Sequence, residues 1–421
     1  MRASAQYAFS EDRFADMTHV SSDGRGVDRT ALFESIALVC AETSLALNDL
    51  SFLFNDLYDL YADYGIEAIF VKQMEVLILQ DRMRRLAPEV MQKLIMHHCD
   101  KGELLEAEEI IWHVDVDCLD LDQVLSVCRS QGLYDALIHV FTQALNDFVS
   151  PVIELASLIV GMMSYEADDA NEEARRIADA YKVFSYFSVV LVGRQYPSQA
   201  ALPAALAFAA QSAVYSFLFC PTSDSLSKGQ RQRLQAEAES STFLQQEYPI
   251  LRLFLNFDAE AFMDSLDIAM EAAYLSEESG AMTRQEIIEV MCQLSAAFKD
   301  SDICTFIDIF VARNIPKYPQ FIKLSGIEAR DVLYRLSTIG SDSNREDRQL
   351  AAESLLGNPI EGGLKPLFDL FEKAGFFHIL QRAYRREQQW DRLLVMLLKD
   401  PDVGDSIFAE IQGIFTRRPR K

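Results

Sequence analysis

Apolar side chains recur at helical spacing along almost the whole chain from Ala31 onward. Phe54, Tyr58 and Tyr61 stand at i, i+4 and i+7, which places them on one face of a helix. The pattern predicts a series of amphipathic helices, each about 10–20 residues long and separated by short breaks. Runs of alternating β-branched residues are nearly absent, so an all-α fold is expected. A second stripe with helical spacing is formed by Leu133, Leu137, Val140 or Phe141, Ala144 and Phe148.

Some of the predicted helices are apolar on more than one face. The segment 150–163, SPVIELASLIVGMM, is an example. Such a helix must be covered on two sides, as the inner helices of stacked pairs are. Short connections between successive helices imply antiparallel hairpins. The expected architecture is therefore an α-solenoid of stacked antiparallel helical hairpins.

An internal repeat supports this stacking. The segment 132–141, GLYDALIHVF, aligns with the segment 375–384, GFFHILQRAY. The leading glycine can take the left-handed conformation that ends the preceding helix, and the apolar pair after it restarts the buried face. Residues 64–66 and 101–104 are weaker copies of the same pattern. A hairpin of this kind cannot bury its apolar face alone, so neighbouring hairpins are expected to stack.

Polar breaks divide the chain into predicted segments. The stretch 221–242 is Ser-rich and has room for one exposed helix, and GSDSNRED at 340–347 predicts a second surface loop. Asp28 or Thr30 is expected to cap the first helix. The predicted organisation is a flexible N-terminal segment (1–30), a first solenoid segment (31–220), the Ser-rich loop (221–242), a second solenoid segment (243–416) and a basic tail (417–421).

Composition adds that the chain can bury a core and that its surface is acidic. Half of the residues are hydrophobic, whereas glycine (17) and proline (12) are scarce, which favours helices over disorder. The 39 Lys and Arg against 64 Asp and Glu give a net charge of −25. Because this charge repels nucleic-acid phosphates and anionic lipid, basic protein surfaces are the expected partners. The basic residues at 417–421 are interpreted as a solvated tail end.

The cysteines indicate free thiols in a reducing compartment. Their number is odd and no two of them form a C-x-x-C motif, which argues against a disulfide framework. The N-terminus, MRASAQYAFSEDRF, lacks the apolar core of a secretory signal. The seven cysteines, most of them among apolar neighbours, are Cys40, Cys99, Cys118, Cys128, Cys220, Cys292 and Cys304.

The stretch 195–223 carries no charged residue and raises the question of a membrane span. Pro203, Gln211 and Ser212 interrupt it, and alanine outnumbers leucine and isoleucine. A span usually needs about 20 strongly apolar residues. We therefore expect a buried solenoid helix here.

One cluster suggests a zinc site but lacks the required spacing. His97, His98 and Cys99 are adjacent, so on a helix their side chains point about 100° apart and cannot converge on one ion. The next candidate ligands, His113 and Cys118, do not complete a zinc pattern. We predict no metal site from these residues.

A run of acidic residues suggests a calcium loop. An EF-hand needs glycine at its sixth position and glutamate at its twelfth, where this chain has Asp120 and Ser126. The interpretation that we favour is a linker whose aspartates cap the next helix. The run consists of Asp115, Asp117, Asp120 and Asp122.

No sequence motif indicates catalysis. The chain contains no G-x-S-x-G, H-E-x-x-H, P-loop or G-x-G-x-x-G pattern, and only six histidines. Any acid–base pair would have to be assembled by the fold from distant parts of the chain. The prediction is therefore a protein that is not an enzyme, with no catalytic, cofactor-binding or metal-binding residues.

Three blocks of sequence carry a resemblance to a known family. The block 87–155, from APEVMQKLIMHHCDKGEL to FVSPVIEL, is long and unusual, and 32–79 and 315–356 extend the likeness. Together they resemble the central region of the Rab-binding vacuolar protein sorting family, the eighth of that series, which belongs to the CORVET tethering complex. The likeness spans about residues 31–411 and is weak between about 164 and 245.

The resemblance implies fold, partners and role. The family combines an N-terminal β-propeller, a clathrin-type α-solenoid and a C-terminal RING domain. Neither propeller strands before residue 31 nor a Cys/His zinc pattern after residue 400 is evident, so the solenoid alone is expected here. The implied role is a scaffold in endosomal vesicle tethering and transport to the vacuole or lysosome.

The implied partners are proteins. They are the class C core subunits shared by CORVET and HOPS, and an early-endosomal Rab GTPase reached indirectly or through the propeller. Membrane association would then be peripheral, on early endosomes or vacuoles, from the cytoplasm. The alternative is a related coat or late-endosomal, HOPS-type solenoid subunit, although the block 87–155 fits the first family better.

Overall fold

The computed structural model describes residues 18–20, 26–28, 30–164, 170–236, 241–276, 280–298, 301–357, 363, 365–400, 408 and 412. Helices dominate these residues, and the predicted all-α class is confirmed. One antiparallel pair of short strands, β1 (Thr18–Val20) and β2 (Gly26–Asp28), lies in the segment predicted to be a flexible entry. Strands of three residues are too short for an alternating pattern to reveal them. The basic tail at 417–421 lies outside the described residues.

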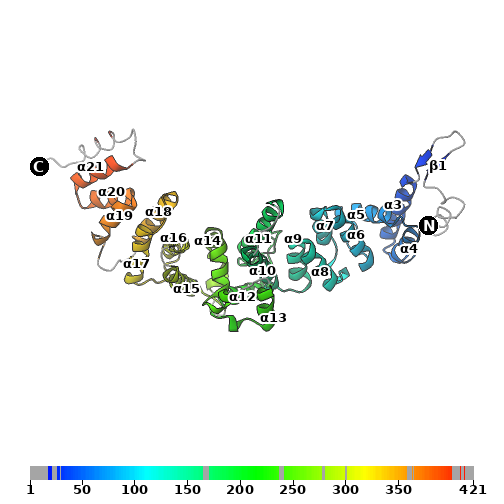
Figure 1. Cartoon of the computed structure of the whole chain (residues 1–421), viewed down its shortest axis with the longest axis horizontal. Coiled ribbons are helices and arrows are strands. Elements are labelled where there is room, and N and C mark those ends of the chain that lie inside the picture. The colour runs from blue at the N-terminus through cyan, green and yellow to red at the C-terminus, as the bar shows by residue number, and fades with distance from the viewer. Residues whose placement is uncertain are drawn as a thin grey trace. The chain divides into compact units, whose positions relative to one another are not determined.

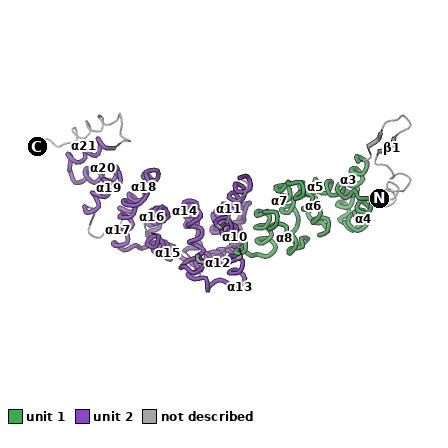
Figure 2. Tube along the Cα trace, viewed as in Figure 1, with its two compact units in different colours: residues 1–151 green, residues 152–421 purple. Residues whose placement is uncertain are grey.

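The chain forms two compact units, residues 1–151 and 152–421 (Figure 2). In unit 1, successive helices form hairpins (Figure 1), and α3, α5, α7 and α9 lie side by side in chain order. The helices of this unit are α3 (Thr30–Ala46), α4 (Tyr58–Asp63), α5 (Glu67–Leu79), α6 (Pro88–Lys101), α7 (Leu104–His113), α8 (Leu121–Gln131) and α9 (Tyr134–Ala144).

Unit 2 repeats the arrangement, with α14, α16 and α18 packed side by side and α15 and α17 on the neighbouring layer. The predicted loop 221–242 lies inside this unit, because its helix α13 packs through the fully buried Leu234. The helices are α10 (Ser150–Ser164), α11 (Ala170–Val190), α12 (Ala204–Leu218), α13 (Lys228–Ala236), α14 (Pro249–Ala269), α15 (Arg284–Ala297), α16 (Asp302–Lys317), α17 (Gly326–Thr338), α18 (Arg345–Leu355), α19 (Phe368–Ala374), α20 (Phe377–Arg386) and α21 (Trp390–Lys399).

The predicted apolar stripes form the cores of the units. Tyr58 and Tyr61 are buried in unit 1, and the Tyr61 hydroxyl donates to the Phe33 carbonyl at 2.6 Å. Phe54 is partly buried and packs against this core from the π-helical turn Phe52–Leu57 ahead of α4. In unit 2, α10 is buried along most of its length, as its two-sided apolar pattern predicts.

The predicted repeat is a turn that recurs between helices. Gly65, Gly102, Gly132 and Gly375 all have a left-handed backbone, with φ between 67° and 76°. After each glycine, the next N–H donates to the carbonyl five residues earlier, for example Leu133 to Cys128 at 2.8 Å. This pairing is the Schellman motif, which ends one helix and aims the next. The repeat predicted from the sequence is therefore confirmed at all four positions.

A further copy of this turn, at Gln388, carries no glycine. Gln388 has φ 59°, and the following Gln389 N–H donates to the Tyr384 carbonyl at 2.9 Å. A residue with a Cβ is strained in this conformation. The missing glycine explains why the sequence pattern did not reveal the turn between α20 and α21.

Replacing Gln388 with glycine is expected to raise the free energy of unfolding by about 0.5–1 kcal/mol, because it removes left-handed strain at a smaller entropic cost. Gly102→Ala is the matched control, and it is expected to lower the free energy of unfolding, because alanine is strained at φ 76°. Backbone strain alone would account for this loss, since an added Cβ at Gly102 would have no neighbour within 4 Å. Urea unfolding followed by circular dichroism measures both variants. A Gln388→Gly chain that is no more stable than the wild type would contradict this reading of the turn.

The predicted surface loop at 340–347 is shorter than expected. Residues 342–344 form a single 3₁₀ turn, and Arg345 already begins α18. Glu346 and Asp347 lie in the first turn of that helix, where acidic residues are favoured by the helix dipole. The polarity of these two residues predicted a loop, but it marks the start of a helix.

Candidate protein-interaction grooves

The structure gives the candidate zinc ligands other partners. His98 is buried on α6, with Nδ1 at 2.9 Å from Glu103 Oε2 and Nε2 at 3.3 Å from Glu75 Oε2. The ring therefore links α5 to the turn after α6. Burial and the neighbouring Asp100 raise the pKa of Cys99, which disfavours the thiolate that a metal needs. In the described part of the chain, no three His, Cys, Asp or Glu side chains are placed to hold a metal ion.

The other metal candidates serve local structure. His113 Nδ1 lies 3.0 Å from Asp81 Oδ1, and Asp115 pairs with Arg85 at 3.2 Å. Asp120 caps α8 by accepting the Gln123 N–H at 3.3 Å. The prediction that an aspartate of this run caps the next helix is therefore confirmed for Asp120.

The thiols match the predicted free cysteines. None of the seven is in a disulfide, and all except Cys118 and Cys292 are buried. Burial raises the pKa of Cys128 and of Cys292 to about 12. Thiols with such values are protonated at neutral pH and are poor nucleophiles.

The uncharged stretch contains α12, a helix of 15 residues. Its buried positions include Val214, Tyr215 and Leu218, as expected of a solenoid helix. Gln211, one of the polar interruptions, is buried and donates from Nε2 to the Leu191 carbonyl at 2.8 Å. Among the described residues, no helix combines the length and the apolarity that crossing a bilayer requires.

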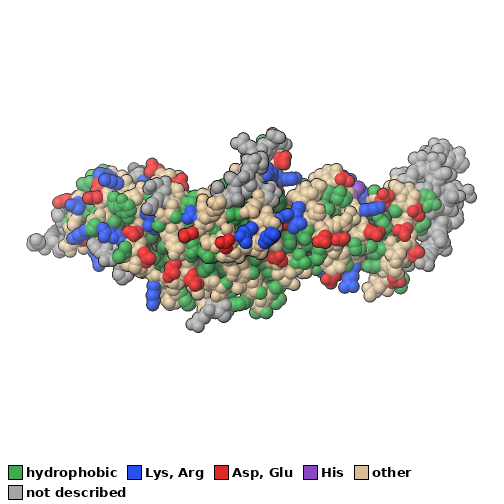
Figure 3. Space-filling model, turned by 60° about the horizontal axis from the view of Figure 1, so that its bottom comes forward, with side chains coloured by type: hydrophobic (Ala, Val, Ile, Leu, Met, Phe, Trp, Pro, Cys, Tyr) green, Lys and Arg blue, Asp and Glu red, His purple; other side chains and the backbone are tan. Residues whose placement is uncertain are grey.

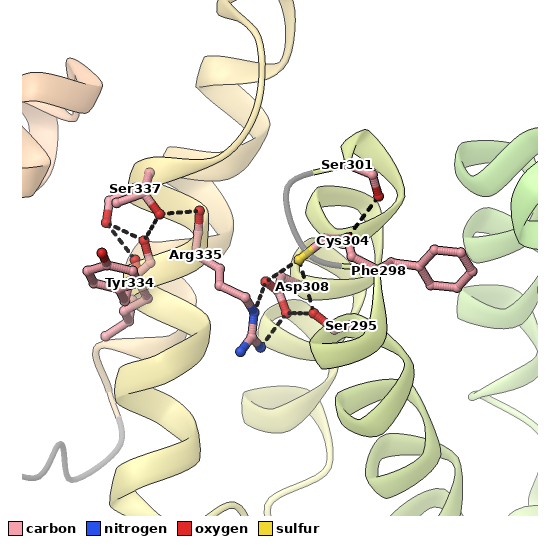
Figure 4. Close-up of polar contacts among 10 residues, drawn as sticks. Ser295, Phe298, Ser301, Cys304, Asp308, Tyr334, Arg335 and Ser337 are labelled. Atoms are coloured by element: carbon pink, nitrogen blue, oxygen red, sulfur yellow. Dashed lines mark hydrogen bonds and ion pairs between the residues drawn. The ribbon is translucent and has the colours of Figure 1, made fainter. Parts of the chain in front are cut away.

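A buried ion pair joins three helices of unit 2. Asp308 on α16 is fully buried and accepts both hydrogen bonds of the Arg335 fork from α17, at 2.7 and 2.8 Å. Ser295 on α15 donates to the same carboxylate at 2.8 Å, and Cys304 lies beside it (Figure 4). Burial raises the pKa of Asp308, and the hydrogen bonds from Arg335 oppose that shift. This network fixes α15, α16 and α17 relative to one another.

A groove of about 510 Å³ lies between α15 and α17, beside this network. On each helix, the lining residues stand at i, i+3, i+4 and i+7, so each helix turns one whole face toward the groove. They are Glu289, Cys292, Gln293 and Ala296 on α15, and Glu328, Asp331, Val332 and Arg335 on α17. The groove holds three carboxylates, and its one guanidinium is paired with Asp308.

A smaller groove of about 190 Å³ lies between α14, α16 and the start of α18. Its rim includes Glu260, Asp264 and Asp347, of which Asp347 pairs with Arg313 at 2.8 Å. Partial burial, together with the nearby carboxylates, raises the pKa of Asp264. On the face shown in Figure 3, acidic and basic side chains are interspersed among apolar ones. The net charge of the chain therefore does not single out a binding site on this face, whereas the grooves do.

No pattern in the sequence indicated these grooves directly. Asp308 lies in the apolar run FIDIFVARNI at 306–315, and a carboxylate at the buried register of such a run is the one signal that could have revealed the ion pair. The acidic positions of α15 and α17 look like ordinary solvated faces. Only the packing of both helices on α16 brings them to one groove.

Stacked antiparallel hairpins joined by a recurring Schellman turn define an α-solenoid, a class whose exposed faces commonly bind other proteins. Within that class, a family model described as the Vps8 central TPR matches residues 69–270. The match runs through 164–245, where the sequence alone carried little resemblance. TPR denotes a repeat of helical hairpins, consistent with the predicted α-solenoid.

Curated relatives extend the likeness over most of the chain. The proteins named vacuolar protein sorting-associated protein 8 homolog from Mus musculus and Homo sapiens are each 27% identical over 391 residues, covering 91% of this chain and 26% of the relative. Vacuolar protein sorting-associated protein 8 of Saccharomyces cerevisiae is 22% identical over 383 residues, covering 85% of this chain and 29% of the relative. The chain thus spans about a quarter of the length of these relatives. The resemblance predicted from the sequence is confirmed.

Proposed function

We propose that this chain is the scaffold segment of a vacuolar protein sorting subunit that works in an endosomal tethering complex of the CORVET type. The observation that carries the proposal is the match of residues 69–270 to the Vps8 central TPR family within a fold of stacked hairpins. A solenoid of this kind acts by holding partners at defined positions. The net charge of −25 supports partner proteins over nucleic acid.

The proposed partners are the class C core subunits, with an early-endosomal Rab GTPase as an indirect partner. An acidic solenoid is repelled by anionic lipid, so its place on endosomal or vacuolar membranes would come through these proteins. The proposed mechanism is geometric: folded hairpins keep binding faces at fixed spacing, and no chemical step is involved.

Capture by the purified chain tests this function. The chain is immobilised and offered the purified class C core subunits, and in separate arms an early-endosomal Rab loaded with GTP or with GDP. We expect capture of the core and no nucleotide-dependent capture of the Rab. An unrelated helical protein of similar negative charge serves as control for nonspecific attraction.

The outcomes separate the alternatives. GTP-dependent capture of the Rab would assign recognition to the solenoid itself. A folded chain that captures no more core than the acidic control would contradict the proposed scaffold role and favour a coat-type solenoid. Capture of the core with late-endosomal, HOPS-specific subunits in preference to CORVET subunits would favour the HOPS-type alternative.

A further inference from the structure

The groove between α15 and α17 is an unfilled space between two helices that both pack on α16. Its length follows from the lining, since residues i to i+7 span about 10 Å along a helix. Ala296 is exposed in it and Cys292 is half-buried, and these two supply its apolar surface, while Val332 forms the buried floor. Two facing helix surfaces with an apolar strip between them form the shape that receives the side chains of a third helix.

The lip of the groove is apolar as well. Ile327 and Tyr334 are 59% and 52% exposed on α17. They stand at i−4 and i+3 from Asp331, so the three form one stripe beside the groove. Large exposed apolar side chains next to a cavity, here two turns apart with a carboxylate between them, are typical of a protein contact surface.

The charge of the groove selects its occupant. Glu289, Glu328 and Asp331 line it, and the guanidinium of Arg335 is taken by Asp308 at 2.7 and 2.8 Å. Lys323 lies toward one end, where its backbone N–H donates to Gln285 at 2.8 Å. The groove therefore presents a surplus of negative charge around an apolar strip, which complements lysine and arginine beside an apolar stripe.

We propose that the groove between α15 and α17 binds one amphipathic helix of a partner protein, with its apolar stripe in the groove and rows of Lys or Arg on both flanks. The proposal rests on the proposed scaffold function for the existence of such a partner. The partner's apolar residues would cover Ala296 and Cys292, and its basic residues would pair with Glu289, Glu328 and Asp331. In helix-in-groove binding of this kind, the partner helix inserts apolar side chains at positions i, i+3, i+4 and i+7 into the groove.

A designed peptide tests the groove on the full chain. The probe is a fluorescein-labelled helical peptide of about four turns, with leucine at i, i+3, i+4 and i+7 and lysine on both flanks. A matched peptide carries glutamate in place of every lysine. Fluorescence anisotropy should show that the lysine peptide binds at least about tenfold more tightly than the glutamate peptide.

Matched variants locate the binding. Asp331→Lys reverses a charge in the groove and Ala296→Trp fills it, and each should weaken binding of the lysine peptide about tenfold. Asp264→Lys makes the same charge change in the smaller groove of unit 2 and should leave the affinity within about twofold. Circular dichroism and the melting temperature check that each variant folds.

A thiol placed in the groove supplies an independent reading. Gln293 lines the groove and is exposed, and the native Cys118 is half-buried in unit 1. Bound lysine peptide should slow alkylation of a Gln293→Cys thiol and leave Cys118 unchanged, as measured by mass spectrometry. Protection of both thiols alike would overturn the assignment.

Other results would also overturn the proposal. Equal weakening by Asp331→Lys and Asp264→Lys would indicate general attraction to an acidic chain, and unaltered binding to Ala296→Trp would place the peptide elsewhere. Self-association of the chain that Asp331→Lys abolishes would assign the groove to a second copy. Failure here leaves capture of the class C core untouched, because that experiment does not depend on which face binds.

Discussion

Replacing Arg335 with alanine is expected to lower the free energy of unfolding of unit 2 by about 3–5 kcal/mol. The substitution leaves the fully buried Asp308 carboxylate without the two hydrogen bonds that it accepts at 2.7 and 2.8 Å. The buried charge would then keep only the Ser295 hydroxyl and the Cys304 thiol as donors, which do not replace the hydration that it has lost. Although burial lowers the pKa of Arg335, the hydrogen bonds to Asp308 raise it overall, so the guanidinium stays protonated and the loss applies at any physiological pH.

Tryptophan fluorescence can follow this unit separately. The chain has two tryptophans, Trp112 in unit 1 and Trp390 in unit 2. In a Trp112→Phe background, the signal of Trp390 during urea unfolding reports on unit 2. The same background is used for every variant, so its own effect cancels.

Two controls separate the buried pair from ordinary surface charge. Lys399→Ala removes an exposed pair with Glu372 in the same unit and should change the free energy of unfolding by less than about 1 kcal/mol. The double variant Asp308→Leu with Arg335→Met should recover most of the loss, because an apolar pair needs no compensating charge. If Arg335→Ala cost no more than Lys399→Ala, the network would not hold the three helices together.

Replacing Arg348 with alanine is expected to lower the free energy of unfolding of unit 2 by about 3 kcal/mol. Arg348 is buried on α18 and donates to the backbone carbonyls of Leu336, Ile339 and Ser341, each at 2.9 Å. These carbonyls belong to the end of α17 and the turn after it, and they have no helical partner of their own. Without the guanidinium, several buried acceptors would be left unsatisfied.

The backbone is shaped around this side chain. Gly340 has φ 115°, and a Cβ there would lie 2.8 Å from Arg348 Nε. Arg348→Lys keeps the charge but has no planar fork, so it should lose about half of the stability that Arg348→Ala loses. The same Trp390 assay measures both variants. Equal stability of wild type and Arg348→Ala would show that water replaces the guanidinium, contrary to this account.

The same device occurs a second time in unit 2. Arg284, at the start of α15, is buried and donates to the Met270 and Ala272 carbonyls at 2.8 Å each. Its guanidinium also lies over the rings of Tyr318 and Phe321, with centroid distances of 4.8 and 5.0 Å. A buried arginine thus closes the end of the preceding helix at two places in unit 2, after α14 and after α17, and the sequence pattern revealed neither because isolated arginines look like surface residues.

Periodicity was enough to predict the helices and their stacking. The stripe through Tyr58 and Tyr61 became core, and the left-handed glycines at 102, 132 and 375 lie where the repeat placed them. These features are local, since a glycine turn or an apolar stripe depends on a few neighbours in the chain. The family resemblance was equally accessible, because it depends on sequence blocks and not on packing.

Features that depend on tertiary contacts were not predictable in the same way. Asp308 and Arg335 are 27 residues apart, and no local rule pairs them. The carboxylates of Glu289 and Asp331 belong to one groove only because α15 and α17 both pack on α16. The boundary between the two compact units, at Pro151 and Val152, likewise depends on packing and not on local polarity.

Flotation of the chain with vesicles tests the scaffold account most directly. Anionic vesicles are prepared bare or with the class C core subunits attached through a nickel-chelating lipid, and the chain is mixed with each and floated through a density gradient. The account predicts that the chain, with its net charge of −25, floats with the core-bearing vesicles and not with bare ones. A folded chain that floats with bare vesicles, or that stays behind even when the core is present, would contradict it.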